Sequence, residues 1–209
     1  MFLLALALGV LIGWLRGGSL SGVARLPVRW VVLLPIPFLI RSALRHPLAA
    51  NVELLSEWAF LWQGVAYGLL VVLAVVNRHL PGSTYLMAGT AANALVIMLN
   101  GGQMPVSEWA IRVAAGGAEQ VVAVTLLRTG NSLTHEVLGP ETRLPWLADI
   151  IPLPRPFPFP SVASAGDVVI ALGLLWLIIT AMGARPRHAA PEGAVAHQPD
   201  EEPRVAHHE

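Results

Sequence analysis

The sequence contains no cysteine and no lysine, and each absence excludes a kind of chemistry. Without cysteine the chain has no disulfide, no thiolate nucleophile, no thiolate metal site and no lipid-modified cysteine. All 13 basic residues are arginines, which excludes Schiff-base catalysis by lysine and the lysine of a phosphate-binding P-loop. The formal net charge is zero and no basic face is evident, so the electrostatic footprint of a nucleic-acid-binding protein is missing too.

Charge of either sign is scarce, whereas apolar residues are abundant. Charged residues make up 12% of the chain and hydrophobic residues 55%, with a mean hydropathy of +0.64. These values are far from those of a soluble domain. Because a membrane-crossing helix needs about 20 apolar residues, we predict an all-α, polytopic transmembrane bundle over residues 1–183. Residues 184–209 are rich in Pro, His and Glu and are expected to form a disordered tail.

Apolar segments predict about five membrane spans, at residues 1–20, 28–44, 58–76, 85–99 and 162–182. The first has no positive residue before it, which is typical of an uncleaved span rather than a signal peptide. The second contains Pro35 and Pro37, which are expected to kink or unwind it. Residues 101–161 hold no window long enough to span and are expected to form an outer, membrane-associated loop with short interfacial helices near 107–115 and 119–127.

The arginines in short loops predict the orientation, because cytoplasmic loops carry an excess of positive residues. With five spans and the N-terminus outside, the outer side receives Arg41 and Arg45, and the cytoplasm receives Arg16, Arg25, Arg29, Arg78, Arg185 and Arg187. The sequence therefore predicts a multi-pass protein of a bacterial inner membrane. Its loop 101–161 lies on the outer face and its tail in the cytoplasm.

Two asparagines lie in or next to the fourth predicted span. Asn93 and Asn100 are seven residues apart, about 20° from one helical face, and Gly89 on this helix allows close helix approach. One interpretation is hydrogen bonding between helices. The other is a polar pocket near the outer face.

Two carboxylates near the outer face are candidates for chemistry. Asp167 follows Ser164 by three residues, a spacing typical of a helix N-cap with an acid in the first turn. Asp149 lies among the apolar residues Trp146 to Ile151, which indicates burial and the need for a partner. If the two carboxylates meet, they can share a proton and act as acid and base on a water molecule.

The candidate pocket around these residues draws on the end of the fourth span and on the loop: Asn93, Asn100, Gly101, Gly102, Met104, Asn131 and His135. His135 has two interpretations, a solvated loop residue beside Glu136 or a ligand joining Asp149 and Asp167 around a divalent ion. No spacing signature supports a metal, and we predict no metal and no cofactor.

The run Asn93 to Val106, which contains Asn100-Gly-Gly-Gln-Met-Pro105-Val, resembles a bacterial family of uncharacterised multi-pass membrane proteins. The segments Leu147-Ala-Asp149-Ile-Ile-Pro152 and Ser164-Ala-Gly-Asp167 extend the resemblance to about residue 182. It implies a recurring bacterial membrane module and no particular activity.

A second resemblance is to the lipoprotein signal peptidases, small membrane aspartyl enzymes with a Val-Val-Asp-Phe-like motif and a later Asn-x-Ala-Asp motif. Leu147-Ala-Asp149-Ile and Ser164-Ala-Gly-Asp167 are similar to these motifs in order and separation. This chain has Ser-Ala-Gly where those enzymes have Asn and Ala before the aspartate, and it has an extra predicted span. The resemblance implies a hydrolase with Asp149 and Asp167 as the catalytic pair.

The sequence therefore predicts one of two classes of function. The first is a non-enzymatic module in the lipid bilayer that binds a lipid, a lipopeptide, a small solute or another membrane protein through the outer pocket. The second is an intramembrane aspartyl hydrolase.

Overall fold

The computed structural model describes residues 1–183 except for 47, 116–123, 126, 131 and 158. The expected disordered tail, Asn131 and most of the expected helix at 119–127 therefore lie outside the described residues. The α-helices are α1 (Phe2–Leu15), α2 (Leu20–Ala24), α3 (Pro35–Arg45), α4 (Glu53–Ser56), α5 (Ala59–Val76), α6 (Ser83–Leu99), α7 (Glu108–Ala115) and α9 (Ala165–Gly183). Short 3-10 turns occur at Val31–Leu33, Ala49–Asn51 and Pro145–Leu147.

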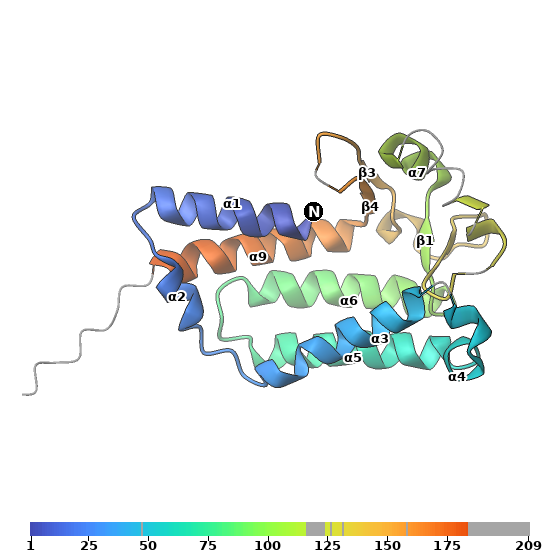
Figure 1. Ribbon diagram of the computed structural model, residues 1–209, viewed down its shortest axis with the longest axis horizontal. Helices are drawn as coiled ribbons and strands as arrows, with labels where there is room; N and C mark the ends of the chain where they lie inside the picture. Colours follow the sequence, from blue (N-terminus) through green and yellow to red (C-terminus); the bar gives the residue numbers. More distant parts are fainter. Residues whose placement is uncertain (47, 116–123, 126, 131, 158, 184–209) are drawn as a thin grey trace, which may run out of the picture.

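The helices α1, α9, α6, α5 and α3 lie side by side in that order, and successive helices along the chain alternate in direction (Figure 1). Two of them, α5 and α9, are long and apolar enough to cross a membrane. The helices α1 and α6 are apolar but shorter, and α3 has only 11 residues with a polar face. The protein is thus mostly helical, as predicted, with two candidate spanning helices.

Small residues let α9 pack closely against both of its neighbours. A Cβ on Gly89 of α6 would lie 2.4 Å from the backbone oxygen of Gly166 in α9. On the other side, a Cβ on Gly13 of α1 would lie 2.6 Å from the sulfur of Met182. The close helix approach expected at Gly89 is confirmed. It places the first turn of α9 beside Gly89 of α6.

Two predicted spans differ from the observed helices, the second at its start and the first at its end. Pro35 is the first residue of α3, so the prolines begin this helix rather than kink it. The reason is that proline's fixed φ suits the first helical turn, where its missing N–H is not needed. The first helix ends at Leu15 instead of near Leu20, because Gly17 with φ of 77° turns the chain and Gly18 N–H bonds to Gly13.

The described residues between 101 and 163 form a cap over one end of the bundle (Figure 1). The cap contains β1 (Met104–Val106), paired in parallel with β2 (His135–Val137), and β3 (Ile151–Leu153), paired antiparallel with β4 (Ser161–Ala163). The register places Met104 opposite His135 and Ile151 opposite Ala163. The sequence predicted helices and loop here, because three-residue strands among prolines carry no measurable alternation. The short helix expected at 107–115 is confirmed as α7.

Apolar and polar residues are distributed unlike those of a soluble bundle. Large apolar side chains are exposed on the bundle helices and on the 3-10 turn before α3, among them Leu3, Leu15, Val32, Leu39, Leu61, Val65, Leu172 and Trp176. Of the apolar windows in α5 and α9, only 22% and 33% of the residues are buried. Polar side chains lie inside, including Gln63, Thr90, Asn93 and Ser164.

Candidate functional site

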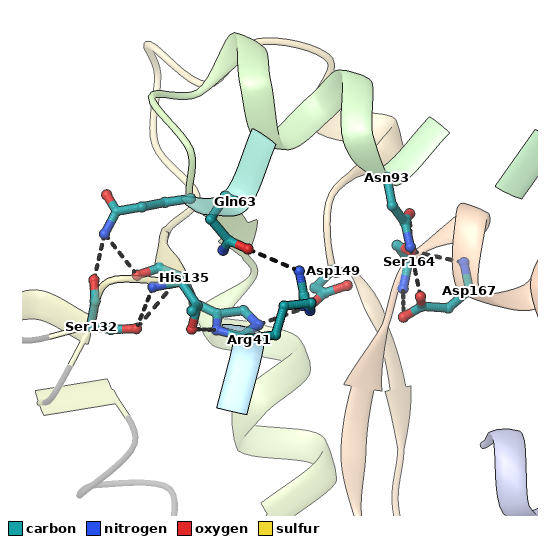
Figure 2. Close-up of polar contacts among 10 residues, drawn as sticks. Arg41, Gln63, Asn93, Ser132, His135, Asp149, Ser164 and Asp167 are labelled. Carbon is teal, nitrogen blue, oxygen red and sulfur yellow. Dashed lines mark hydrogen bonds and ion pairs between the residues drawn. The ribbon is translucent and has the colours of Figure 1, made fainter. Parts of the chain in front are cut away.

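The start of α9 is held to α6 by a closed group of three polar residues, the Asn93 cluster (Asn93, Ser164 and Asp167; Figure 2). Asn93 Nδ2 donates to Asp167 Oδ1 at 2.7 Å, and Ser164 Oγ donates to Asn93 Oδ1 at 2.8 Å. Asp167 N–H donates to Ser164 Oγ at 3.0 Å, and Ser164 N–H lies 3.4 Å from Asp167 Oδ2. This reciprocal pattern is a capping box.

Two sequence-based interpretations are settled by these bonds. Asp167 caps its own helix, and Asn93 ties two helices together, as the structural interpretations of both residues predicted. The spacing of Ser164 and Asp167 was the signal for the cap. Both oxygens of the Asp167 carboxylate are engaged, which leaves this carboxylate little freedom for other partners.

Asn100 does not join Asn93 but fastens the cap to the bundle. Its Nδ2 donates to the backbone oxygens of Val96 and Arg143 at 2.7 and 2.9 Å, and its Oδ1 accepts from Arg143 N–H at 2.8 Å. Gly101 and Gly102 follow with φ of 66° and 91°, and a Cβ on Gly102 would lie 2.9 Å from the Cα of Phe60. These candidate pocket residues form the turn between α6 and β1.

A second polar group lies where the cap meets α3 and α5, and we name it the Arg41–Asp149 cluster (Arg41, Gln63, Tyr67, His135 and Asp149). Asp149 lies in this cluster because its backbone pairs with β1 and the residue after it. The Asp149 N–H donates to the carbonyl of Pro105 and the Asp149 carbonyl accepts from the N–H of Ser107, both at 2.9 Å. Asp149 as a whole residue is 8% exposed. Its Oδ2 lies 4.0 Å from Nε2 of His135, which faces it from β2 (Figure 2).

The bundle contributes the other members from the facing sides of α3 and α5. Arg41 Nη1 donates to Gln63 Oε1 at 3.1 Å (Figure 2). The guanidinium carbon of Arg41 lies 4.5 Å from the centre of the Tyr67 ring. Gln63 is fully buried and Tyr67 is nearly so. Among the described residues, Gln63 Nε2 and Asp149 Oδ1 are buried polar atoms without a hydrogen-bond partner.

Burial sets the protonation of the two titratable groups that the cap contributes. It raises the pKa of Asp149 to about 8, with a smaller contribution from the negative charge of Asp167. It lowers the pKa of His135 to about 3, helped by the positive charges of Arg45 and Arg41. At neutral pH both are therefore uncharged, and Nδ1 of the neutral imidazole is held 2.8 Å from the Thr134 hydroxyl.

Asp149 and Asp167 each have their own set of partners. They are close enough for the charge of Asp167 to affect the pKa of Asp149, yet no hydrogen bond joins them within the described part of the chain. The catalytic pair stays a prediction. Within that same part of the chain, no group of three His, Asp or Glu residues is arranged to hold a metal ion.

Sequence reasoning missed Arg41, Gln63 and Tyr67. On sequence grounds Arg41 counts only toward the orientation, on the outer side, although it falls inside the second predicted span. Gln63 falls inside the third predicted span and was the more direct signal, since a polar side chain at membrane depth needs a partner. Met104, a candidate pocket residue, instead packs with Tyr67, Val96 and Ile97 in the apolar core.

The fold and these clusters define a mostly helical bundle whose capped end encloses polar residues, and the comparisons place the chain in a family. It belongs to a family of unknown function, DUF5317, whose model matches residues 25–179. This range contains both polar clusters and leaves out α1. The chain is also similar to an uncharacterized protein of Thermotoga maritima, with 24% identity over 197 residues that cover 94% of this chain and 96% of the relative. No solved structure matches the chain.

Proposed function

We propose that this protein is a multi-pass membrane protein that binds a polar group at the Arg41–Asp149 cluster, without catalysing a reaction. The observation that supports the proposal is the placement of polar side chains inside a bundle whose outside is apolar. A soluble monomer rarely exposes contiguous apolar patches beyond a few hundred Å². Here the exposed apolar side chains occur on all five bundle helices, α1, α3, α5, α6 and α9.

The five bundle helices are the proposed spans. The 18 residues of α5 cover about 27 Å and the 14 of α1 about 21 Å, against a hydrocarbon thickness of about 30 Å. The 3-10 turn at Val31–Leu33 lengthens the path of α3. Alternating helix directions put the start of α1, the cap and the Arg41–Asp149 cluster at one end of the bundle (Figure 1).

The proposed orientation places that end outside a bacterial inner membrane. Arg16, Arg25, Arg29 and Arg78 all lie at or near the opposite end of the bundle helices, in short connections. Short arginine-rich connections favour the cytoplasm, whereas a long connection such as the cap contributes little to orientation. In this orientation the polar cluster faces the outer leaflet.

The absence of cysteine makes a direct test possible. Glu141→Cys in the cap and Ala24→Cys at the opposite end are both exposed positions in an otherwise cysteine-free chain. In intact cells, a membrane-impermeant maleimide should label the variant at 141, and should label the variant at 24 only after permeabilisation. Labelling of both in intact cells, or release of the chain from membranes by alkaline carbonate, would contradict the proposal.

The hydrolase remains the alternative, and the specific observation in its favour is the electrostatic coupling of Asp149 to Asp167. It requires the Asp167 carboxylate to leave its bonds with Asn93 and Ser164. Cleavage of a lipopeptide by the wild type that is lost in both Asp149→Asn and Asp167→Asn would favour it. Binding without turnover favours the binding module.

A further inference from the structure

The Arg41–Asp149 cluster offers hydrogen-bond donors and few free acceptors. The one acceptor of the Gln63 side chain, Oε1, is taken by Arg41. Its donor, Nε2, is buried without a partner in the described part of the chain. Arg41 uses one N–H for Gln63 and stacks its guanidinium on Tyr67, which leaves several of its five donors unused. Such a donor-rich site is complementary to an acceptor-rich group.

Among the described residues, Arg41 of this cluster also has no counter-charge in contact with it. Arg41 and Arg45 lie one turn apart on α3, and within the described residues no carboxylate lies within 4.0 Å of either. The arginines of the cap differ, because Arg112 and Arg128 both pair with Glu108, at 3.0 and 2.6 Å. A partly buried guanidinium without a counter-ion is unfavourable, so the site favours binding of an anion.

The two nearby carboxylates do not supply the missing negative charge. Asp167 is engaged by Asn93 and by the backbone of Ser164. Asp149 is 8% exposed, and its pKa of about 8 keeps most of its population protonated at neutral pH. A protonated carboxyl is a donor, and Asp149 Oδ1 has no protein partner in the described residues. Asp149 therefore adds a third donor type to those of Arg41 and Gln63.

We propose that the Arg41–Asp149 cluster binds a phosphate group, with Arg41, Gln63 and Asp149 as its hydrogen-bond donors. The inference rests on the proposed binding function and adds the chemical class of the ligand. A phosphate carries several acceptor oxygens and suits the planar fork of arginine. Its source is either a phospholipid headgroup, which lies at the level of a bundle end, or free inorganic phosphate.

The test uses the full chain purified in detergent, with ligand binding followed by native mass spectrometry. The three probes are inorganic phosphate, phosphatidylglycerol and diacylglycerol, which has acyl chains but no phosphate. Wild type should bind at least one of the two phosphate probes. Binding of phosphatidylglycerol alone identifies a lipid headgroup, whereas binding of inorganic phosphate that also displaces the lipid identifies the free anion.

The decisive variant is Gln63→Glu, which keeps the side-chain shape and places a carboxylate beside Arg41. It should weaken phosphate binding by about tenfold or more, because Arg41 becomes paired internally and the new charge repels the anion. Arg78→Gln, which removes an exposed arginine at the opposite end of the bundle, is the matched control and should bind as wild type does. If Gln63→Glu does not fold, Arg41→Lys keeps the charge but loses the fork and should also weaken binding.

Three results would overturn the inference. The first is equal phosphate binding by wild type and by the folded cluster variant. The second is binding of diacylglycerol alone, which would retain the binding module but not its ligand class. The third is binding of none of the probes. Membrane location is tested separately by cysteine labelling, so failure of the inference and failure of the proposed location are distinguishable.

Discussion

Asp149 shows how strongly one residue depends on its surroundings. In an unfolded chain its carboxyl has a pKa near 3.8, and burial between the cap and the bundle raises that pKa to about 8. Its backbone position is fixed by pairing with β1, so the side chain cannot move to water without breaking two backbone hydrogen bonds. The folded protein therefore holds a proton there that the unfolded chain releases over a wide pH range.

This difference predicts a pH-dependent effect of Asp149→Asn. Between about pH 4 and pH 8 the folded state binds the proton and the unfolded state does not, so the contribution of Asp149 to wild-type stability should fall as pH rises through this window. The asparagine does not titrate. The stability of the variant relative to wild type should rise by about 1 kcal/mol per pH unit across that window, measured by denaturant unfolding in detergent. A pH-independent difference would show that Asp149 ionises normally.

His135 provides the control because its shift has the opposite sign. Its folded pKa of about 3 lies below its unfolded value of 6.5, so the contribution of His135 to wild-type stability should fall as pH drops from about 6.5 towards 3. His135→Asn should remove this acid-side loss and leave the loss linked to Asp149 between about pH 6.5 and pH 8 unchanged. An altered response between about pH 6.5 and pH 8 would mean that the imidazole, and not burial, controls Asp149.

At the scale of elements, glycines decide how close the helices come. Gly89 of α6 faces the backbone of α9, and a Cβ there would lie 2.4 Å from the oxygen of Gly166 and 2.9 Å from the nitrogen of Ile170. Backbone atoms cannot rotate away, so the helices would have to separate. Separation would also lengthen the bond from Asn93 to Asp167 one turn further along.

We therefore predict that Gly89→Ala lowers the free energy of unfolding by about 1 to 3 kcal/mol, the usual cost of overpacking. The matched control is Gly68→Ala in α5, where no atom lies within 4 Å of the added Cβ. The control should be neutral or slightly stabilising, because alanine is the better helix former. Thermal melting in one detergent compares the two, and equal melting temperatures would contradict the packing argument.

The elements also show what the sequence can and cannot predict. The helix predicted at 58–76 is observed at Ala59–Val76, because its apolar run is bounded by polar residues and a Pro-Gly turn. The Ser164 to Asp167 spacing likewise predicted the start of α9. The strands of the cap were missed because three residues show no period. The Arg41–Asp149 cluster was missed because its members come from α3, α5 and two distant parts of the cap, and only tertiary pairing brings them together.

On the scale of the whole molecule, few polar bonds join the bundle to the described residues of the cap. Asn100 supplies two of them, since its side chain donates to and accepts from the backbone of Arg143. This pairing imitates a strand ladder between the end of α6 and the cap. It holds in place the segment that continues through the turn at Pro145–Leu147 to Asp149. The position of Asp149 above Arg41 thus depends on a contact outside the cluster itself.

Asn100→Ala should therefore loosen the cap while leaving the bundle intact. We expect hydrogen exchange at the Arg143 amide and its neighbours to become about tenfold faster, because the backbone N–H and carbonyl of Arg143 lose their side-chain partner. Exchange within α9 should be unchanged, because the helix hydrogen bonds do not involve Asn100. Asn51→Ala, at an exposed 3-10 turn, is the control and should alter neither region. Faster exchange throughout α9 as well would mean that cap and bundle unfold as one unit. The Arg41–Asp149 cluster could then become exposed to water only when the bundle helices unfold too.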